Sequence, residues 1–275
     1  MSKKKRKHSL LWKAIDKDTS IESYIYGTIH IRDEQVYFLF DLLKKLIAGC
    51  EVFIAEYPLD SDNSEFIQYM HFENEGHLRD FLDKKKYDKL NKQLQKTFGV
   101  DLDRLGYFKP MVIENMLTES LFGMDYPFPM DILLWNYAKS LGLELVGAET
   151  LQEQINIMKS LPVKDQVKSL VEIGRNTKKF KKKIEKLTGY YKNQNLPLLY
   201  KKSAKSLGKM RKILIYDRNV RIANTFASYA KEKKVFMAIG AGHLYGEKGV
   251  LRLIKQKGFK VVPYKEARAD KSQEE

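Results

Sequence analysis

Apolar residues along the chain follow two spacings, and each spacing predicts one kind of element. Residues 9–15 and 23–31 are β-rich and flank the turn-forming sequence DKDTS, so they predict a hairpin. Residues 36–50 carry apolar positions in an amphipathic helical pattern. Residues 52–57 (VFIAEY) form a short apolar run that predicts the next strand. This order of strand, helix and strand is typical of a parallel sheet.

Longer helical patterns interrupt the strands. From about residue 63 to residue 130 apolar residues recur three and four positions apart, which predicts a helical insertion. A helix (ILLWNYAKSLG) and a strand (residues 143–149, LELVGAE) follow, and Thr150 is the expected N-cap of the next helix. Residues 163–233 are again helical and basic.

A further βαβ unit closes the chain. Its predicted elements are the strand VFMAIG, the helix GVLRLIKQKG and the strand FKVVPY. Together these patterns predict an α/β fold, with a mixed central sheet flanked by helices. At 275 residues and 43% hydrophobic content, the chain is expected to form one folded domain over residues 9–265. Residues 1–8 are expected to be a disordered basic leader, and residues 266–275 a frayed tail.

Positive charge is unevenly distributed. The chain has 50 Lys and Arg against 35 Asp and Glu, and much of the excess of +15 lies in residues 3–7 (KKKRK) and 178–186 (KKFKKKIEK). Such runs attract nucleic acid, anionic lipid or acidic substrates. No nucleic-acid recognition motif accompanies them, so we interpret them as solvated arms and helix faces. A basic nucleic-acid-associated protein stays as an alternative.

The sequence favours a cytoplasmic protein. No apolar stretch approaches the length of a membrane span, and the basic N-terminus runs into LLWKAIDKD, which is too interrupted for a signal peptide. The single cysteine, Cys50, cannot form an internal disulfide and is expected to pack as a small hydrophobe. The sequence leaves the oligomeric state open, including a homodimer.

Four predicted strands end in residues that can carry chemistry, and they are His30, Glu56, Glu149 and His243. In an open α/β sheet, ligands bind beyond the carboxyl ends of the strands. Taken singly, a histidine at a strand end is usually structural, and Glu149 before Thr150 could simply complement a helix dipole. Taken together, two imidazoles with one or two carboxylates suit a divalent ion of manganese, cobalt, iron or zinc, which could activate water.

Three glycines near these strand ends and an Arg-Asn pair on a predicted helix are further candidates for the site. Gly27, Gly240 and Gly242 would let a substrate main chain or a metal approach closely, although they could equally make tight turns. Arg218 and Asn219 lie on an amphipathic helix, from which Arg218 could steady a carboxylate or an oxyanion.

Two other motifs give weaker evidence of a functional site. GAGHLYG resembles a dinucleotide-binding fingerprint, but its third glycine would fall at Tyr245. His71 and His77 have an irregular spacing for a metal pair and are interpreted as surface histidines.

The chain resembles the TraB/GumN family, which is related to the Tiki proteins and more distantly to erythromycin-esterase-like enzymes. The likeness lies in the two Gly-x-x-His strand ends, YGTIH and GAGH, in VFIAEY, in LVGAET, in YDRNVRIANTFASYA and in the closing AGHLYGEKG. These stretches span nearly the whole chain after the basic leader.

The resemblance implies a metal-dependent hydrolase, as Tiki-like members are metalloproteases, with the two Gly-x-x-His strand ends meeting at one cleft. It places His30, His243 and Glu56 around a divalent ion, manganese or cobalt before zinc or iron. Glu149 or Glu56 would be the general base, Arg218 would stabilise charge, and Asn219 would help to bind substrate. The expected substrate is a peptide or a small molecule. A non-catalytic module that sequesters a peptide or ligand on the same scaffold is the alternative.

Overall fold

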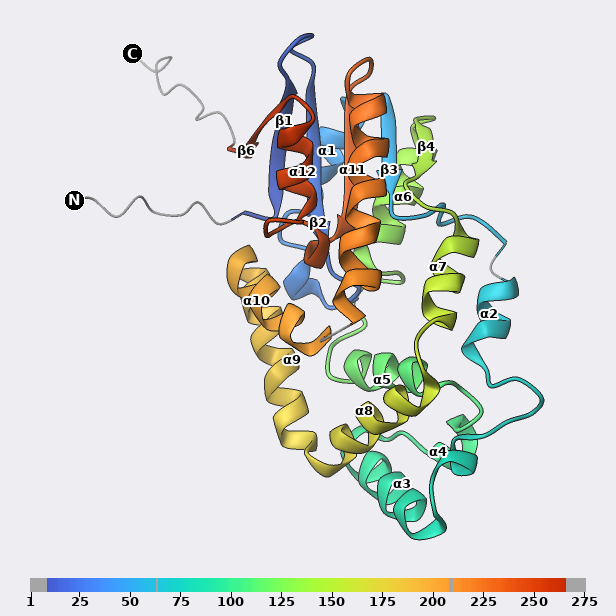
Figure 1. Ribbon diagram of the computed structural model, residues 1–275. Coiled ribbons are helices and arrows are strands. Elements are labelled where there is room, and N and C mark those ends of the chain that lie inside the picture. Colours follow the sequence, from blue (N-terminus) through green and yellow to red (C-terminus); the bar gives the residue numbers. More distant parts are fainter. Residues whose placement is uncertain (1–8, 63, 208–209, 266–275) are drawn as a thin grey trace, which may run out of the picture.

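A mixed six-stranded sheet forms the centre of the described structure (Figure 1). The computed structural model describes residues 9–62, 64–207 and 210–265. The predicted leader and tail, residues 1–8 and 266–275, lie outside them. The strands are β1 (Leu11–Asp16), β2 (Glu22–Thr28), β3 (Val52–Ala55), β4 (Glu144–Gly147), β5 (Val235–Gly240) and β6 (Phe259–Pro263), in the sheet order β4-β3-β5-β2-β1-β6. The predicted α/β class is confirmed.

The central strands of this sheet are parallel. β5 pairs in parallel with both β2 and β3, and β4 pairs in parallel with β3. β1 is antiparallel to β2 and to β6, so β6 runs in the same direction as β5. The connection from β5 through α12 (Val250–Gln256) to β6 therefore crosses over the hairpin of β1 and β2. This arrangement confirms the predicted closing βαβ unit.

The hairpin follows from its turn sequence. Asp16 ends β1, and its Oδ1 accepts hydrogen bonds from the backbone N–H groups of Asp18 at 2.9 Å and Thr19 at 2.8 Å. An aspartate that satisfies the backbone two and three residues ahead stabilises a tight turn. The predicted hairpin is confirmed, with Leu11 paired to Tyr26 in its register.

Helices cover both faces of the sheet, with α11 and α12 in front of it and α1 and α6 behind it in the view of Figure 1. α1 spans Phe40–Ala48, α6 spans Met130–Ser140 and α11 spans Asp217–Ala230. Trp135 of α6 meets the ring of Phe53 edge-on at 6.1 Å, and Phe226 of α11 meets the ring of Phe259 at 5.7 Å. The apolar face of each helix thus packs on the strand residues that point to its side of the sheet.

A second hydrophobic cluster lies below the sheet, among helices. Its helices are α3 (Lys84–Phe98), α4 (Leu102–Leu105), α5 (Pro110–Glu119), α8 (Val163–Arg175) and the first half of α9 (Thr177–Lys192). The two helical stretches predicted from the sequence therefore pack on each other, although the strand β4 separates them in the chain. Tyr191, near the end of α9, belongs to the sheet cluster instead, so α9 joins the two clusters.

The remaining helices are α2 (Ser64–Met70), α7 (Leu151–Lys159) and α10 (Leu196–Leu207). Thr150 caps α7 as predicted: its side chain accepts from the Glu153 N–H at 3.1 Å, and the Glu153 carboxylate accepts from the Thr150 N–H at 2.8 Å. Cys50 is buried, as predicted. Among the described helices, none combines the length and the apolar character that crossing a membrane requires.

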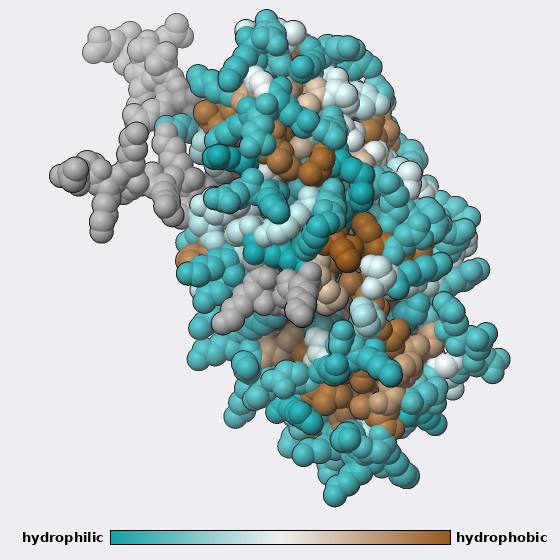
Figure 2. Space-filling view, in the orientation of Figure 1, coloured by the Kyte–Doolittle hydropathy of each residue, from teal (hydrophilic) through white to brown (hydrophobic). Residues whose placement is uncertain are grey.

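The face of the molecule in Figure 2 is mostly hydrophilic. Apolar side chains gather in the middle of this face and among the helices of its lower part. The second hydrophobic cluster lies in that lower, helical part, and its core residues are at most 7% exposed.

Replacing Gly27 with alanine should destabilise the fold. A Cβ at Gly27 would lie 2.7 Å from Leu244 Cδ1 and 3.1 Å from the Ala241 Cα, and overpacking of this kind costs about 1 to 3 kcal/mol. Gly242→Ala is the matched control, because a Cβ there meets nothing within 4 Å. Urea unfolding followed by circular dichroism measures both variants. Equal midpoints for the two variants would contradict the packing argument.

Candidate active site at the carboxyl edge of the sheet

The sheet order brings the predicted strand-end residues to one edge. β4, β3, β5 and β2 are consecutive neighbours and all parallel, so their carboxyl ends lie side by side. The residues that follow them are, in the same order, Glu149, Glu56, His243 and His30. The residue Thr28 pairs with Gly240 at this end of β2 and β5, so both Gly-x-x-His motifs leave the sheet on adjacent strands.

Glu56 is bound on both carboxylate oxygens. Its Oε1 accepts a hydrogen bond from the Gly240 N–H at 2.8 Å, and its Oε2 accepts one from Arg218 Nη2 at 2.5 Å. Burial by itself would raise the pKa of this carboxyl, but His243, Arg218 and the Gly240 N–H together lower the pKa of Glu56 to about 2. Glu56 is therefore a fixed negative charge.

Glu149 lies deeper, with only 3% of its surface exposed. Its Oε2 accepts from Arg218 Nε at 2.7 Å and from Gln154 Nε2 at 2.7 Å, and its Oε1 accepts from Arg221 Nη2 at 2.6 Å. A buried carboxylate is stable only when its lone pairs are satisfied in this way. The low pKa of Glu56 and the burial of Glu149 make both carboxylates poorly suited to the predicted role of general base.

Arg218 is buried between the two glutamates. Its three guanidinium nitrogens donate to Glu149, to Glu56 and to the carbonyl of Leu214, the last at 3.3 Å. Three of its five N–H donors are engaged in this way, so the geometry makes Arg218 a positioning residue, and its predicted contact with developing charge stays a prediction. It holds the ends of β3 and β4 against α11.

Arg221 lies one helical turn from Arg218 and is the more solvent-exposed of the two arginines. Its side chain is 41% exposed, and its Nη2 is bound to Glu149. Its Nε is buried and has no hydrogen-bond partner among the described residues. The exposed part of the Arg221 side chain, rather than the buried Nε, is accessible to an anionic oxygen beside the glutamates.

Asn219 orients His243. The Asn219 amide donates through Nδ2 to the carbonyl of Lys248 at 2.6 Å, so its Oδ1 is the atom that faces His243 Nδ1 at 2.7 Å. An amide oxygen can only accept, and Nδ1 therefore carries the proton of the neutral ring. Nε2 keeps its lone pair and lies 3.7 Å from Glu56 Oε1. Asn219 is fully buried, which makes it a support for the histidine, and its predicted contact with substrate stays a prediction.

The environment of His243 favours the neutral ring. Burial lowers the pKa of His243, and the charge of Arg218 lowers it further, while Glu56 and Glu149 oppose the shift. The ring is 5% exposed and belongs to a short 3₁₀ turn (Ala241–His243) directly after β5.

His30 is the more open histidine, with 61% of its side chain exposed. Its Nδ1 lies 3.4 Å from Asp131 Oδ2, in the first turn of α6. Loss of hydration lowers the pKa of His30, but the hydrogen bond and charge of Asp131 outweigh it, so the net shift raises the pKa. The two imidazoles are thus shifted in opposite directions.

The three candidate glycines have different surroundings. Gly240 lies against Glu56 and donates its N–H to it. Gly242 has open space where a Cβ would stand, and its role in admitting a substrate stays a prediction. Gly27 faces Leu244 and Ala241 within the protein, so the structure assigns it to close packing of β2 against the turn after β5.

The predicted metal ligands do not fit a divalent ion in this arrangement. Among the described residues, no group of three or more His, Cys, Asp and Glu side chains is placed to hold a metal. Both oxygens of Glu56 are engaged, and the guanidinium of Arg218 adds a positive charge that opposes a cation. The set of His30, Glu56 and His243 accordingly stays a prediction, and we derive no step through a metal.

Three residues of the site were given no role by the sequence analysis: Asp131, Gln154 and Arg221. Asp131 follows a proline and a methionine at a helix start, where acidic residues usually complement the helix dipole. Gln154 follows Glu149 at the start of α7, and Arg221 follows Arg218 by one helical turn. The spacing from Arg218 to Arg221 is the one signal that could have indicated a second arginine on the same helix face.

Among residues 9–62, 64–207 and 210–265, two histidines lie outside the site, His71 and His77, and both have structural roles. The prediction that both lie at the surface is wrong for His77, which is 5% exposed and caps a short helical turn by accepting from the Arg79 N–H at 3.1 Å. His71 stacks on Phe108 with ring centroids 4.3 Å apart. The His77 ring is buried because it packs against the rings of Tyr87 and Tyr107, with centroids 5.8 Å and 4.7 Å away.

Comparisons with known proteins agree with the resemblance in the motifs. The family model of the TraB/PrgY/gumN family matches residues 10–263, nearly the whole chain. Neither the curated proteins nor the solved structures gave a significant match. The matched range includes all the strands of the sheet and every residue of the candidate site, and the chain therefore belongs to the TraB/PrgY/gumN family.

Proposed function

We propose that the protein is a hydrolase in which His243 is the general base and His30 the general acid. One observation carries the proposal. The two imidazoles follow neighbouring parallel strands, each has its Nδ1 held by a side chain, and each directs an Nε2 that makes no hydrogen bond within the described part of the chain. A pair of titratable groups with opposite pKa shifts is the usual basis for dividing acid and base roles.

In the proposed reaction, His243 Nε2 removes a proton from a water molecule. The water oxygen attacks a carbonyl carbon of the substrate, and negative charge develops on the carbonyl oxygen. The Arg221 guanidinium is the cation available to stabilise that charge. The tetrahedral intermediate then breaks down as His30 donates its proton to the leaving group. Exchange with solvent returns each imidazole to its starting state.

The fixed charges around His243 support its role. When the ring gains a proton, Glu56 at 3.7 Å becomes the counterion of the imidazolium. Asn219 keeps the ring in one tautomer and one orientation through both states. These are the two functions that the third member of a catalytic triad performs for its histidine.

A peptide is the substrate class that we propose, on the basis of the family resemblance. Within the site, His30 and Arg221 have exposed side chains and Gly242 has open space where a Cβ would stand, so these are the residues that we propose for contact with the peptide. The proposed reaction uses no metal ion, and the metal content of the protein is tested separately below.

Replacement of either site histidine should abolish turnover. His243→Gln and His30→Gln remove the proton transfers, which are worth about a hundred-fold to ten-thousand-fold each. His71→Gln is the matched control, because His71 lies outside the site and contacts Phe108. The assay follows cleavage of a quenched fluorescent peptide library and of p-nitrophenyl esters. Cleavage by both site variants at the wild-type rate would refute the proposal, and binding without turnover by the wild type would favour the sequestering alternative.

The profile of kcat/KM against pH should be bell-shaped. The acidic limb reports protonation of His243, whose pKa is lowered, and the alkaline limb reports deprotonation of His30, whose pKa is raised. Asp131→Asn removes the charge that raises the pKa of His30, so the alkaline limb should move to lower pH while the acidic limb stays. The profile of kcat/KM against pH for both proteins measures this. An alkaline limb that does not move would exclude His30 as the acid.

Purified protein should carry little bound metal. Because Arg218 and Arg221 together neutralise the two carboxylates, we expect clearly substoichiometric manganese, cobalt, zinc and iron in elemental analysis, with no change in the double variant His30→Ala, His243→Ala. Activity should survive dialysis against EDTA. Stoichiometric metal that disappears in the double variant would restore the ligand set predicted from the sequence, with metal-activated water in place of the acid–base pair.

A further inference from the structure

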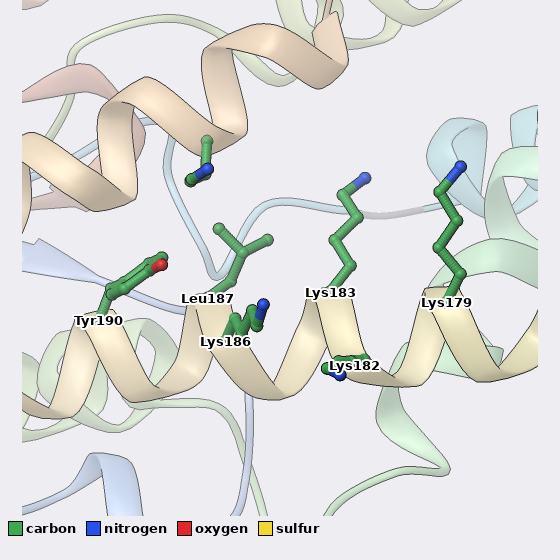
Figure 3. Close-up of a pocket in the computed structure, with 7 residues that line it drawn as sticks. Lys179, Lys182, Lys183, Lys186, Leu187 and Tyr190 are labelled. Atoms are coloured by element: carbon green, nitrogen blue, oxygen red, sulfur yellow. The ribbon is translucent and has the colours of Figure 1, made fainter.

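A lysine-rich groove runs between α9 and α10, away from the four strand-end residues of the site. Its volume is about 260 Å³. Figure 3 shows Lys179 and Lys183 extending from one side of α9, on the same side as Leu187 and Tyr190. The residues that line it are Lys179, Lys182, Lys183, Lys186, Leu187 and Tyr190 of α9, with Lys202 of α10 opposite.

Positive charge dominates the lining. Five of the seven lining residues are lysines and none is acidic. Among these lysines, the described ion pairs include only a long contact of Lys179 with Glu172, at 4.0 Å. Like charges this close repel one another, and an anion in the groove would relieve that repulsion.

The inner end of the groove is apolar and firmly held. Leu187 and Tyr190 pack against the sheet cluster. The next residue, Tyr191, is buried and donates its hydroxyl to the carbonyl of Gly27 at 2.9 Å, while its oxygen lies 2.7 Å from the Tyr26 hydroxyl. This network fixes α9 to β2, so the groove has a rigid wall.

We propose that this groove binds a compact phosphate-bearing ligand of the nucleoside polyphosphate class. Lysine ammonium groups bind phosphate as point charges without a fixed geometry, which suits a row of them at successive turns of a helix. An aromatic and an aliphatic side chain at the inner end offer a surface on which a base can stack. The volume is near the lower limit of ligand pockets, about 300 Å³, which favours a small ligand over a polymer.

The test uses the full chain and a fluorescent ATP analogue, with unlabelled ATP as competitor and no added divalent ion. The groove variant is Lys183→Gln with Lys186→Gln. The control is Lys178→Gln with Lys192→Gln, which removes the same charge from exposed positions of α9 that do not line the groove. We expect saturable binding that weakens at least about ten-fold in the groove variant, as loss of two nearby charges implies, and little in the control.

Three control ligands distinguish specific binding of a nucleoside polyphosphate from a general attraction of the groove to anions. Inorganic tripolyphosphate tests the phosphates alone, adenosine tests the base alone, and a short single-stranded oligonucleotide tests a polymer. ATP binding tighter than each of the three supports the proposal. Tripolyphosphate binding as tight as ATP, tighter binding of the oligonucleotide, or equal losses in the two variants would overturn it. None of these outcomes depends on hydrolysis at the sheet edge.

Discussion

The buried contact of Arg218 with Glu56 and Glu149 is the interaction on which the site depends. A guanidinium removed from water is stable only if carboxylates and carbonyls replace its hydration, and here they bind each of its nitrogens. The two glutamates follow adjacent strands, and the arginine comes from a helix on the face of the sheet. One cation therefore fixes three separate chain segments relative to one another.

That fixed cluster decides which groups remain free for chemistry. Both carboxylates are committed to arginine, so the imidazole of His243 is the buried base left with a free lone pair. Its surroundings hold it neutral, whereas Asp131 favours the protonated form of His30. Two histidines of the same motif thus acquire different properties: burial and the charge of Arg218 lower the pKa of His243, whereas Asp131 raises the pKa of His30.

The helical part of the molecule contributes a second surface. α9 begins in the helical cluster and ends on the sheet, where Tyr191 binds the backbone of β2. Because both ends of α9 are packed, the lysines between them are presented by a rigid helix. A charge run that the sequence analysis interpreted as a solvated helix face therefore also lines a defined groove.

The sequence by itself determined the hairpin, the parallel strands, the cap at Thr150 and the membership of His30, Glu56, Glu149 and His243 in one edge of the sheet. These features depend on local periodicity, on turn and capping chemistry, and on the rule that parallel strands share a carboxyl edge. The tertiary structure decided the partners: Asp131 for His30, Asn219 for His243, and arginine for both glutamates. A side chain's partner, and hence its pKa, is set by contacts between distant segments, and no local pattern encodes that information.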